Sequence, residues 1–132
     1  MSKLILLYFF LFNLKQECNC KIDTSYSYRV YEKVDIYPSF PEGYKEFVNF
    51  FIKNFEPKSK NIYESRLVFV LVIDSTGKII EKSIFGKNRD KYSSNDIEGL
   101  RVIDKSPLWI PGRCNGKIVT VKLILPIYVK IE

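Results

Sequence analysis

The chain has 132 residues, the size of one domain that can bury its own core. Its hydrophobic share of 46% and aromatic share of 15% exclude a disordered chain. The formal net charge is +6, but the basic residues stand singly between apolar runs, so a nucleic-acid partner is not expected. The sequence has no histidine, which removes Ser–His and Cys–His pairs, imidazole ligands and the usual neutral-pH base. We therefore predict a non-enzymatic protein without cofactor or metal.

The first 20 residues have the pattern of an export signal. Lys3 gives a basic start, and an unbroken apolar run follows over 4–12. That run is about half of the ~20 apolar residues that a membrane-spanning helix needs, and it fits the ~7–15 of a signal-peptide core. We predict a signal peptide or short membrane-targeting segment over 1–20, an extended arm over 21–37 and a folded domain over 38–132. The pattern leaves open whether the segment is cleaved, lipidated or retained as an anchor. A buried N-terminal helix is the weaker alternative, because nothing downstream continues its period.

The cysteines fit export without proving it. Cleavage after Cys20 would leave Cys114 as the only cysteine of the mature chain. A lone cysteine in an oxidising compartment can pair between chains, but it is more often a tolerated residue. Cys18 and Cys20 together with Cys114 do not have the spacing of zinc ligands.

The first expected elements of the domain are an arm and a helix. Residues 26–31 alternate loosely between polar and apolar, which favours an extended arm or edge strand. Two prolines and a glycine within 38–43 indicate an extended segment and a turn. Aromatic residues then recur at helical spacing, so we predict an amphipathic helix over 44–55, ended by Pro57, with its aromatic side in the core.

A hairpin is expected next. Residues 65–73 are rich in β-branched side chains and apolar on both parities, as in a strand at the centre of a sheet. The turn is expected from Asp74 to Gly77, where glycine can adopt a positive φ. The return strand is expected from about 78 to 85.

A second helix and a last strand complete the prediction. Asn95 is the expected N-cap, with Glu98 three residues on as in a capping box. The predicted buried side of this helix is formed by Ile97, Leu100, Val102 and Ile103, and Pro107 ends it. A loop over 109–116 leads to a strand over 117–131, in which Pro126 favours an edge position because it has no N–H to donate. We predict an α+β fold in which two helices pack on a small antiparallel sheet.

Four motifs follow one another along residues 30–131. They are Pro38 to Gly43 (P-S-F-P-E-G), Phe55-Glu56-Pro57, the hairpin sequence of 70–80, and residues 107–119 (P-L-W-I-P-G-R-C-N-G-K-I-V). In this order they resemble the C-terminal domain of the TonB family. The resemblance is carried by Pro38, Pro41, Gly43, Asp74, Gly77, Pro107, Trp109, Pro111, Gly112 and Gly116. The residue types indicate structural roles, with Trp109 as a core plug and the glycines and prolines as turn formers.

The resemblance also implies a function. In TonB C-terminal domains the exposed edge of the last strand accepts a short extended segment of an outer-membrane receptor as an added strand. The corresponding edge here is expected at Lys117, Ile118, Val119, Thr120, Val121, Lys122, Leu123 and Leu125. Lys122, and with it Arg113 and Lys117, is expected either to favour an acidic peptide or merely to protect the edge from aggregation. The implied protein is exported, lies in the periplasm or at a membrane of the cell envelope, and takes part in TonB-dependent transmembrane transport.

The alternative is a structural, self-associating envelope protein that forms homodimers through the same edge. Glu42 and Gly99 depart locally from the family's pattern. Energy-transducing members have a full membrane helix and a long proline-rich spacer, whereas the stretch over 21–38 spans at most ~60 Å. We therefore expect that this chain does not itself pull on a receptor.

Overall fold

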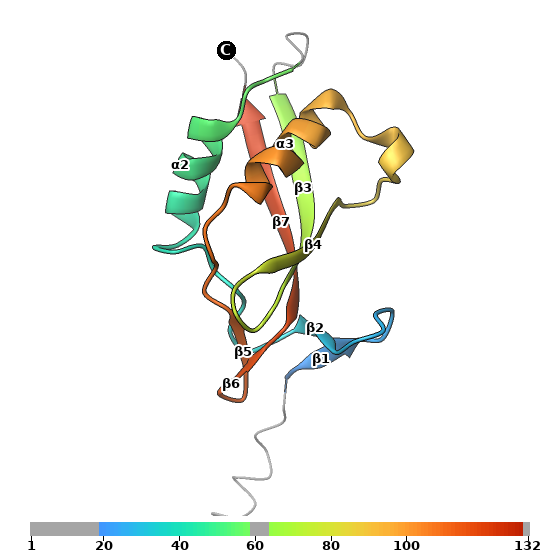
Figure 1. Cartoon of the computed structure of the whole chain (residues 1–132), viewed down its shortest axis with the longest axis vertical. Helices are drawn as coiled ribbons and strands as arrows, with labels where there is room; N and C mark the ends of the chain where they lie inside the picture. The colour runs from blue at the N-terminus through green and yellow to red at the C-terminus, as the bar shows by residue number, and fades with distance from the viewer. Residues whose placement is uncertain (1–18, 59–63, 131–132) are drawn as a thin grey trace, which may run out of the picture.

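The computed structural model describes residues 19–58 and 64–130 (Figure 1). Its helices are α2 (Tyr44–Asn54) and α3 (Ser94–Asp104), with a 3₁₀ turn, η1 (Arg89–Lys91). Its strands are β1 (Lys21–Asp23), β2 (Val30–Lys33), β3 (Glu64–Ile73), β4 (Ile79–Ile84), β5 (Gly112–Cys114), β6 (Lys117–Val119) and β7 (Val121–Lys130). The predicted export segment lies outside the described residues, apart from Asn19 and Cys20. Neither α2 nor α3 is long and apolar enough to cross a membrane.

The strands form a five-stranded sheet in the order β1-β2-β7-β3-β4, and β5 and β6 form a separate two-stranded sheet. β3 pairs antiparallel with both β4 and β7, which confirms its predicted central position. The α+β fold is also confirmed. The sheet is mixed rather than purely antiparallel, because β2 runs parallel to β7 at the pair Tyr31–Val121. Parallel neighbours need a long crossover between them, and here the helices and the β3–β4 hairpin lie between β2 and β7 in the chain.

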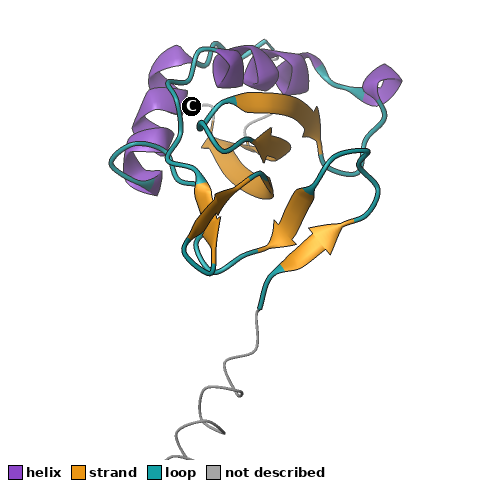
Figure 2. Cartoon of the chain, turned by 60° about the horizontal axis from the view of Figure 1, so that its bottom comes forward, coloured by secondary structure: helices purple, strands orange, loops and turns teal. Residues whose placement is uncertain are grey.

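Both helices lie on one face of the large sheet, and the main core fills the space between (Figures 1 and 2). The period of α2 turns Phe47 and Phe51 inward, and α3 contributes Val102 and Ile103. Side chains alternate along a strand, so every second residue of β3 and β7 reaches the same core. These strand residues are Leu67, Phe69, Leu71, Ile73, Leu125 and Ile127.

Gly99 lets α3 approach the sheet closely. A Cβ at this position would stand 2.8 Å from the Cζ atom of Phe69 and 3.1 Å from the Cδ1 atom of Leu67. Glycine inside a helix costs about 0.5–1 kcal/mol relative to alanine, and here that cost is offset by the closer packing. The glycine at this position therefore has a packing reason.

The predicted start of α3 is wrong by two residues. The N-cap is Ser93, whose hydroxyl accepts from the Asp96 N–H at 3.0 Å, while the Asp96 carboxylate accepts from the Ser93 N–H at 2.9 Å. Asn95 and Glu98 face inward, at 1% and 2% exposure, whereas Ile97 is 59% exposed. The prediction of Ile97 on the buried side is therefore wrong. The side chains of the predicted box, Asn95 and Glu98, instead accept from the Lys58 and Glu56 N–H groups, which follow α2 in the chain.

The predicted last strand over 117–131 is divided at Thr120. Its first part, β6, forms a hairpin with β5 around Asn115 and Gly116, whose φ angles are 51° and 77°. An Asn-Gly pair with two positive φ angles is the favoured two-residue turn between antiparallel strands. The rest of the predicted strand is β7.

Cys20 and Cys114 form a disulfide bond, with their Cα atoms 6.1 Å apart. In the chain that keeps Cys20, Cys114 is therefore not a lone cysteine. A cut directly after Cys20 would remove one half of this bond. The boundary of the export segment at residue 20 stays a prediction.

Candidate peptide-binding edge

β7 is paired along its whole length on one side only. β3 pairs with it from Val121 to Lys130. On the other side β2 pairs with it at Val121, where the Tyr31 N–H donates to the Thr120 carbonyl at 2.9 Å. Past this point, none of the strands in residues 19–58 and 64–130 pairs with the outer side of β7. We call this open side, from residue 122 to residue 128, the β7 edge.

The ladder with β3 decides which backbone groups face the β7 edge. In an antiparallel pair, residues that exchange hydrogen bonds alternate with residues that do not. The Val68 carbonyl accepts from the Phe85 N–H at 2.8 Å, so Val68 turns its backbone toward β4 and its β7 partner Pro126 faces outward. Ile124 and Tyr128 lie two residues to either side of Pro126. Their N–H and C=O groups therefore also point to the open side.

A side chain already uses one acceptor on this edge. The hydroxyl of Tyr44, the first residue of α2, donates to the Pro126 carbonyl at 3.1 Å. Pro126 has no N–H of its own to offer. The groups available to an added strand are thus centred on Ile124, with Tyr128 farther along.

Two hollows flank the β7 edge. On the helix side, a cavity of about 120 Å³ is lined mainly by aromatic and apolar side chains. They include Phe40, Tyr44, Phe47, Trp109, Leu123 and Leu125. On the other side, an open hollow of about 650 Å³ is lined by Lys21, Glu32, Lys33, Tyr37, Lys122, Leu123 and Ile124. A strand that paired with Ile124 would direct alternate side chains toward these two different surroundings.

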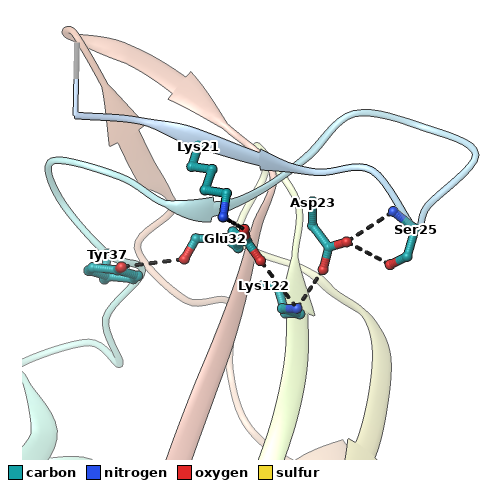
Figure 3. Close-up of polar contacts among 6 residues, drawn as sticks. All are labelled: Lys21, Asp23, Ser25, Glu32, Tyr37 and Lys122. Atoms are coloured by element: carbon teal, nitrogen blue, oxygen red, sulfur yellow. Dashed lines mark hydrogen bonds and ion pairs between the residues drawn. The ribbon is translucent and has the colours of Figure 1, made fainter. Parts of the chain in front are cut away.

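Charges in the second hollow are largely compensated within the protein (Figure 3). The Lys122 ammonium lies 2.5 Å from Asp23 Oδ2 and 3.9 Å from Glu32 Oε2, and Lys21 lies 3.1 Å from Glu32 Oε1. The hydrogen bond from Lys122, followed by those from Ser25, holds the pKa of Asp23 well below its usual range. The same contact with Asp23 raises the pKa of Lys122. The charge of Lys122 is therefore already balanced by Asp23 and Glu32, which weakens its attraction for the acidic peptide that the sequence suggested.

The structure brings together only part of the predicted edge. Lys117, Ile118 and Val119 pair with β5, and the Thr120 carbonyl accepts from Tyr31. Val121 pairs with Tyr31 of β2 and is fully buried. Of the predicted edge residues, Lys122, Leu123 and Leu125 belong to the open part. Arg113 is directed to its own hairpin, where it donates to the Gly116 carbonyl at 3.2 Å.

The two residues that face outward most directly were not among the predicted edge residues. Ile124 is 48% exposed, and Tyr128 is 72% exposed with the Arg66 guanidinium 5.9 Å from the centre of its ring. Pro126 could have indicated them. A proline inside a strand has no N–H for the ladder, so its side of the backbone, and that of the residues two positions away, faces away from a paired neighbour.

The motif residues lie in the turns, in the connections and, for Trp109, in the core. Trp109 is 4% exposed and meets the Phe40 ring edge-on, with 5.6 Å between the ring centroids. The Asp74 carboxylate accepts from the Thr76 and Lys78 N–H groups and shapes the β3–β4 turn. At Gly112 a Cβ would stand 2.6 Å from the Cγ2 atom of Val121. The other motif positions are Pro38, Pro41, Gly43, Gly77, Pro107, Pro111 and Gly116, which lie in the turns and connections around this core.

One group of potential metal ligands occurs in the described ranges. The Cys20, Cys114 and Asp35 ligand atoms lie within 4.8 Å of one another. The two sulfur atoms are bonded to each other, and the Asp35 carboxylate accepts from the Asn115 N–H at 2.6 Å. The group is part of the disulfide region as the structure shows it.

No family model, curated protein or solved structure matches this chain. The geometry of the β7 edge is therefore the basis of the functional proposal.

Proposed function

We propose that this chain is a TonB-like protein of the cell envelope that binds short, extended receptor segments by adding them as a strand to the β7 edge. The single observation that supports this most is the unpaired outer side of β7, which exposes the N–H and C=O of Ile124 between two hollows. The role would be in TonB-dependent transmembrane transport, with segments of outer-membrane receptors as partners. Binding would need no catalytic group or cofactor.

The physical basis is β-augmentation. Main-chain groups at a free sheet edge supply hydrogen bonds to any extended peptide, and side-chain pockets select among sequences. The cavity beside Phe40 and Trp109 suits an apolar side chain. The opposite hollow joins apolar Leu123 and Ile124 to the compensated charges around Lys122, and it would accept a polar or uncharged side chain.

The proposed location rests on two features. The apolar run over 4–12 after Lys3 has the length of a signal-peptide core. The bond between Cys20 and Cys114 fits an oxidising compartment such as the periplasm, because thiols are kept reduced in most cytosols.

Homodimers through the same edge are the second candidate. The exposed side chains of Ile124 and Tyr128 favour it, since an open apolar strand edge is also a place where two copies can pair. Peptide binding depends on the concentration of the peptide, whereas dimer formation depends on the concentration of the protein. The same set of experiments therefore distinguishes the two candidates.

The test is an NMR titration of ¹⁵N-labelled protein with synthetic receptor N-terminal peptides from the same cell. We expect the largest shifts at the amides of Ile124 and Tyr128, with little change in β4. A rise of mass with protein concentration in light scattering, with the β7 edge amides protected before any peptide is added, would replace the proposal by self-association. Unchanged amides in a monomeric protein would refute both.

Ile124→Pro is expected to weaken peptide binding at least about tenfold, because it removes the N–H that faces an added strand. The Pro126 position shows that a proline with the same orientation fits without breaking the ladder with β3. Ile124→Ala is the matched control, which shortens the side chain but keeps the N–H. Isothermal titration with the best peptide measures both variants, after their thermal unfolding has been compared. Equal binding by the proline and alanine variants would exclude main-chain pairing at this position.

A further inference from the structure

The N-terminal hairpin, residues 20–33 with strands β1 and β2, occupies one end of the line along which a partner strand would lie. β2 is the strand next to β7 in the sheet, at the end remote from the two helices (Figure 1). Its Tyr31 N–H is bonded to the Thr120 carbonyl. An added strand that ran along the β7 edge toward Val121 would meet β2 there. The hairpin therefore sets one limit of the β7 edge.

The hairpin packs against the domain through a small cluster of its own. Val34, Cys114 and Val121 form this second cluster, and Cys20, Tyr31 and Val119 are packed against it. The large core beneath the helices is a different cluster. Opening the hairpin therefore disturbs the small cluster and leaves the packing of α2 and α3 on β3 in place.

Besides this packing, the Tyr28–Glu81 hydrogen bond and the bond from the Tyr37 hydroxyl to the Glu32 carbonyl, three contacts of the hairpin bear on the β7 edge. One is the pairing of Tyr31 with Val121, and the second is the ion pair of Asp23 with Lys122. The third is the disulfide between Cys20 and Cys114, which closes a loop with a sequence separation of 94 residues. A cross-link that closes so long a loop restricts the open states of the chain strongly. Cys114 belongs to the second cluster, and Cys20 packs against it.

We propose that the N-terminal hairpin is a cover over one end of the β7 edge, locked by the Cys20–Cys114 disulfide and released when a dithiol reduces it. Release frees the Thr120 carbonyl and separates Lys122 from Asp23. The binding edge then becomes longer and gains a positive charge. This regulation concerns the site of the proposed function and rests on that function for its effect on binding, whereas the release itself does not.

The chemistry is a thiol–disulfide exchange. The thiolate of the dithiol attacks the Cys20 sulfur, the more exposed of the two, and forms a mixed disulfide while Cys114 leaves as a thiolate and takes up a proton. The second thiol of the reductant then displaces Cys20, which is also protonated. The products are two cysteine thiols and one oxidised, cyclic reductant, so two electrons and two protons pass to the protein.

The first experiment measures release without any peptide. Amide hydrogen exchange of the full chain is followed by NMR with and without dithiothreitol, and for the variant with Cys20→Ser and Cys114→Ser. We expect the Tyr31 amide to exchange about a hundredfold faster in both the reduced protein and the variant. The Leu71 amide in β3 serves as the control. It also loses protection on reduction, because a cross-link over 94 residues stabilises the whole fold, but it should still exchange more slowly than Tyr31 in the reduced protein. Tyr31 exchange that is the same in all three samples would overturn the proposal, and so would equal exchange rates of Tyr31 and Leu71 after reduction, which would mean that the hairpin opens only when the whole domain unfolds.

The second experiment measures the effect on binding. Two peptides are compared, one that covers only residues 124–128 of the edge and one extended toward Thr120 with a glutamate placed to meet Lys122. Reduction should strengthen binding of the long peptide about tenfold and leave the short one unchanged. Equal effects on both peptides would overturn the cover. Release of Tyr31 without binding of either peptide in any state would instead refute the proposed function and leave the release established.

Discussion

Gly77→Ala is expected to lower the free energy of unfolding by about 4 kcal/mol or more. Gly77 has a φ of +88°, and a Cβ there would lie 1.9 Å from the carbonyl oxygen of Trp109. The obstacle is backbone, and it is fixed by the Trp109 N–H, which donates to the Gly77 carbonyl at 2.8 Å. The alanine variant must separate the β3–β4 turn from the loop that carries Trp109. That movement withdraws Trp109 from the core beside Phe40 and Phe47.

Gly86→Ala is the matched control for this experiment. Gly86 also has a positive φ, +71°, but nothing lies within 4 Å of a Cβ built on it. Its replacement should cost only about 1–2 kcal/mol, the strain of the left-handed backbone. Urea unfolding followed by tryptophan fluorescence measures both variants, and the signal reports this region because Trp109 is the only tryptophan. Similar losses in the two variants would show that backbone strain, and not the contact with Trp109, explains the glycine.

Glu98→Ala is expected to cost about 3 kcal/mol. The Glu98 side chain is 1% exposed and receives hydrogen bonds from Arg101 Nε at 2.6 Å and from the Glu56 N–H at 2.7 Å. Arg101 also donates to the Asn54 carbonyl at 3.0 Å, so the pair joins α3 to the end of α2. Removal of the carboxylate leaves the Glu56 N–H without its acceptor and leaves the guanidinium with the Asn54 carbonyl but without its counter-charge. Denaturant unfolding should show this loss, and Asp90→Asn, at an exposed carboxylate of η1, should stay within about 0.5 kcal/mol of the parent.

The same carboxylate should make stability depend on acid. Hydrogen bonds from Arg101, the largest cause, lower the pKa of Glu98 to about 2 from its ordinary value of 4.5. The unfolded state therefore takes up a proton at a higher pH than the folded state does. Stability from this group is complete above about pH 5 and is lost as the pH falls toward 2. Glu98→Gln should have lower stability at pH 7 and a shallower decline over that range, and parallel curves for the two proteins would contradict the assignment.

Local patterns were sufficient for most of the elements. The aromatic spacing of 44–55 predicted α2, and Gly77 predicted the β3–β4 turn, because both signals depend on residues close in sequence. The start of α3 was not predictable in this way. Ser93 with Asp96 and Asn95 with Glu98 are both acceptable capping boxes, and the partners that decide between them lie far away, at Glu56 and Lys58.

The candidate site, too, was only partly predictable from local patterns. The last strand and its edge were expected over 117–131 and from Lys117 to Leu125, but no local pattern could show that 117–119 would pair with β5 and leave the open edge to 122–128.

The sequence by itself determined the α+β composition, the central place of β3 and the turn chemistry, because side-chain period and backbone preference act over a few residues. Only the tertiary structure decided which side of β7 stays open, that β2 closes one end of it, and that Cys20 meets Cys114. These features depend on segments that are distant in the chain, and the contacts between such segments are decided by how the whole core packs.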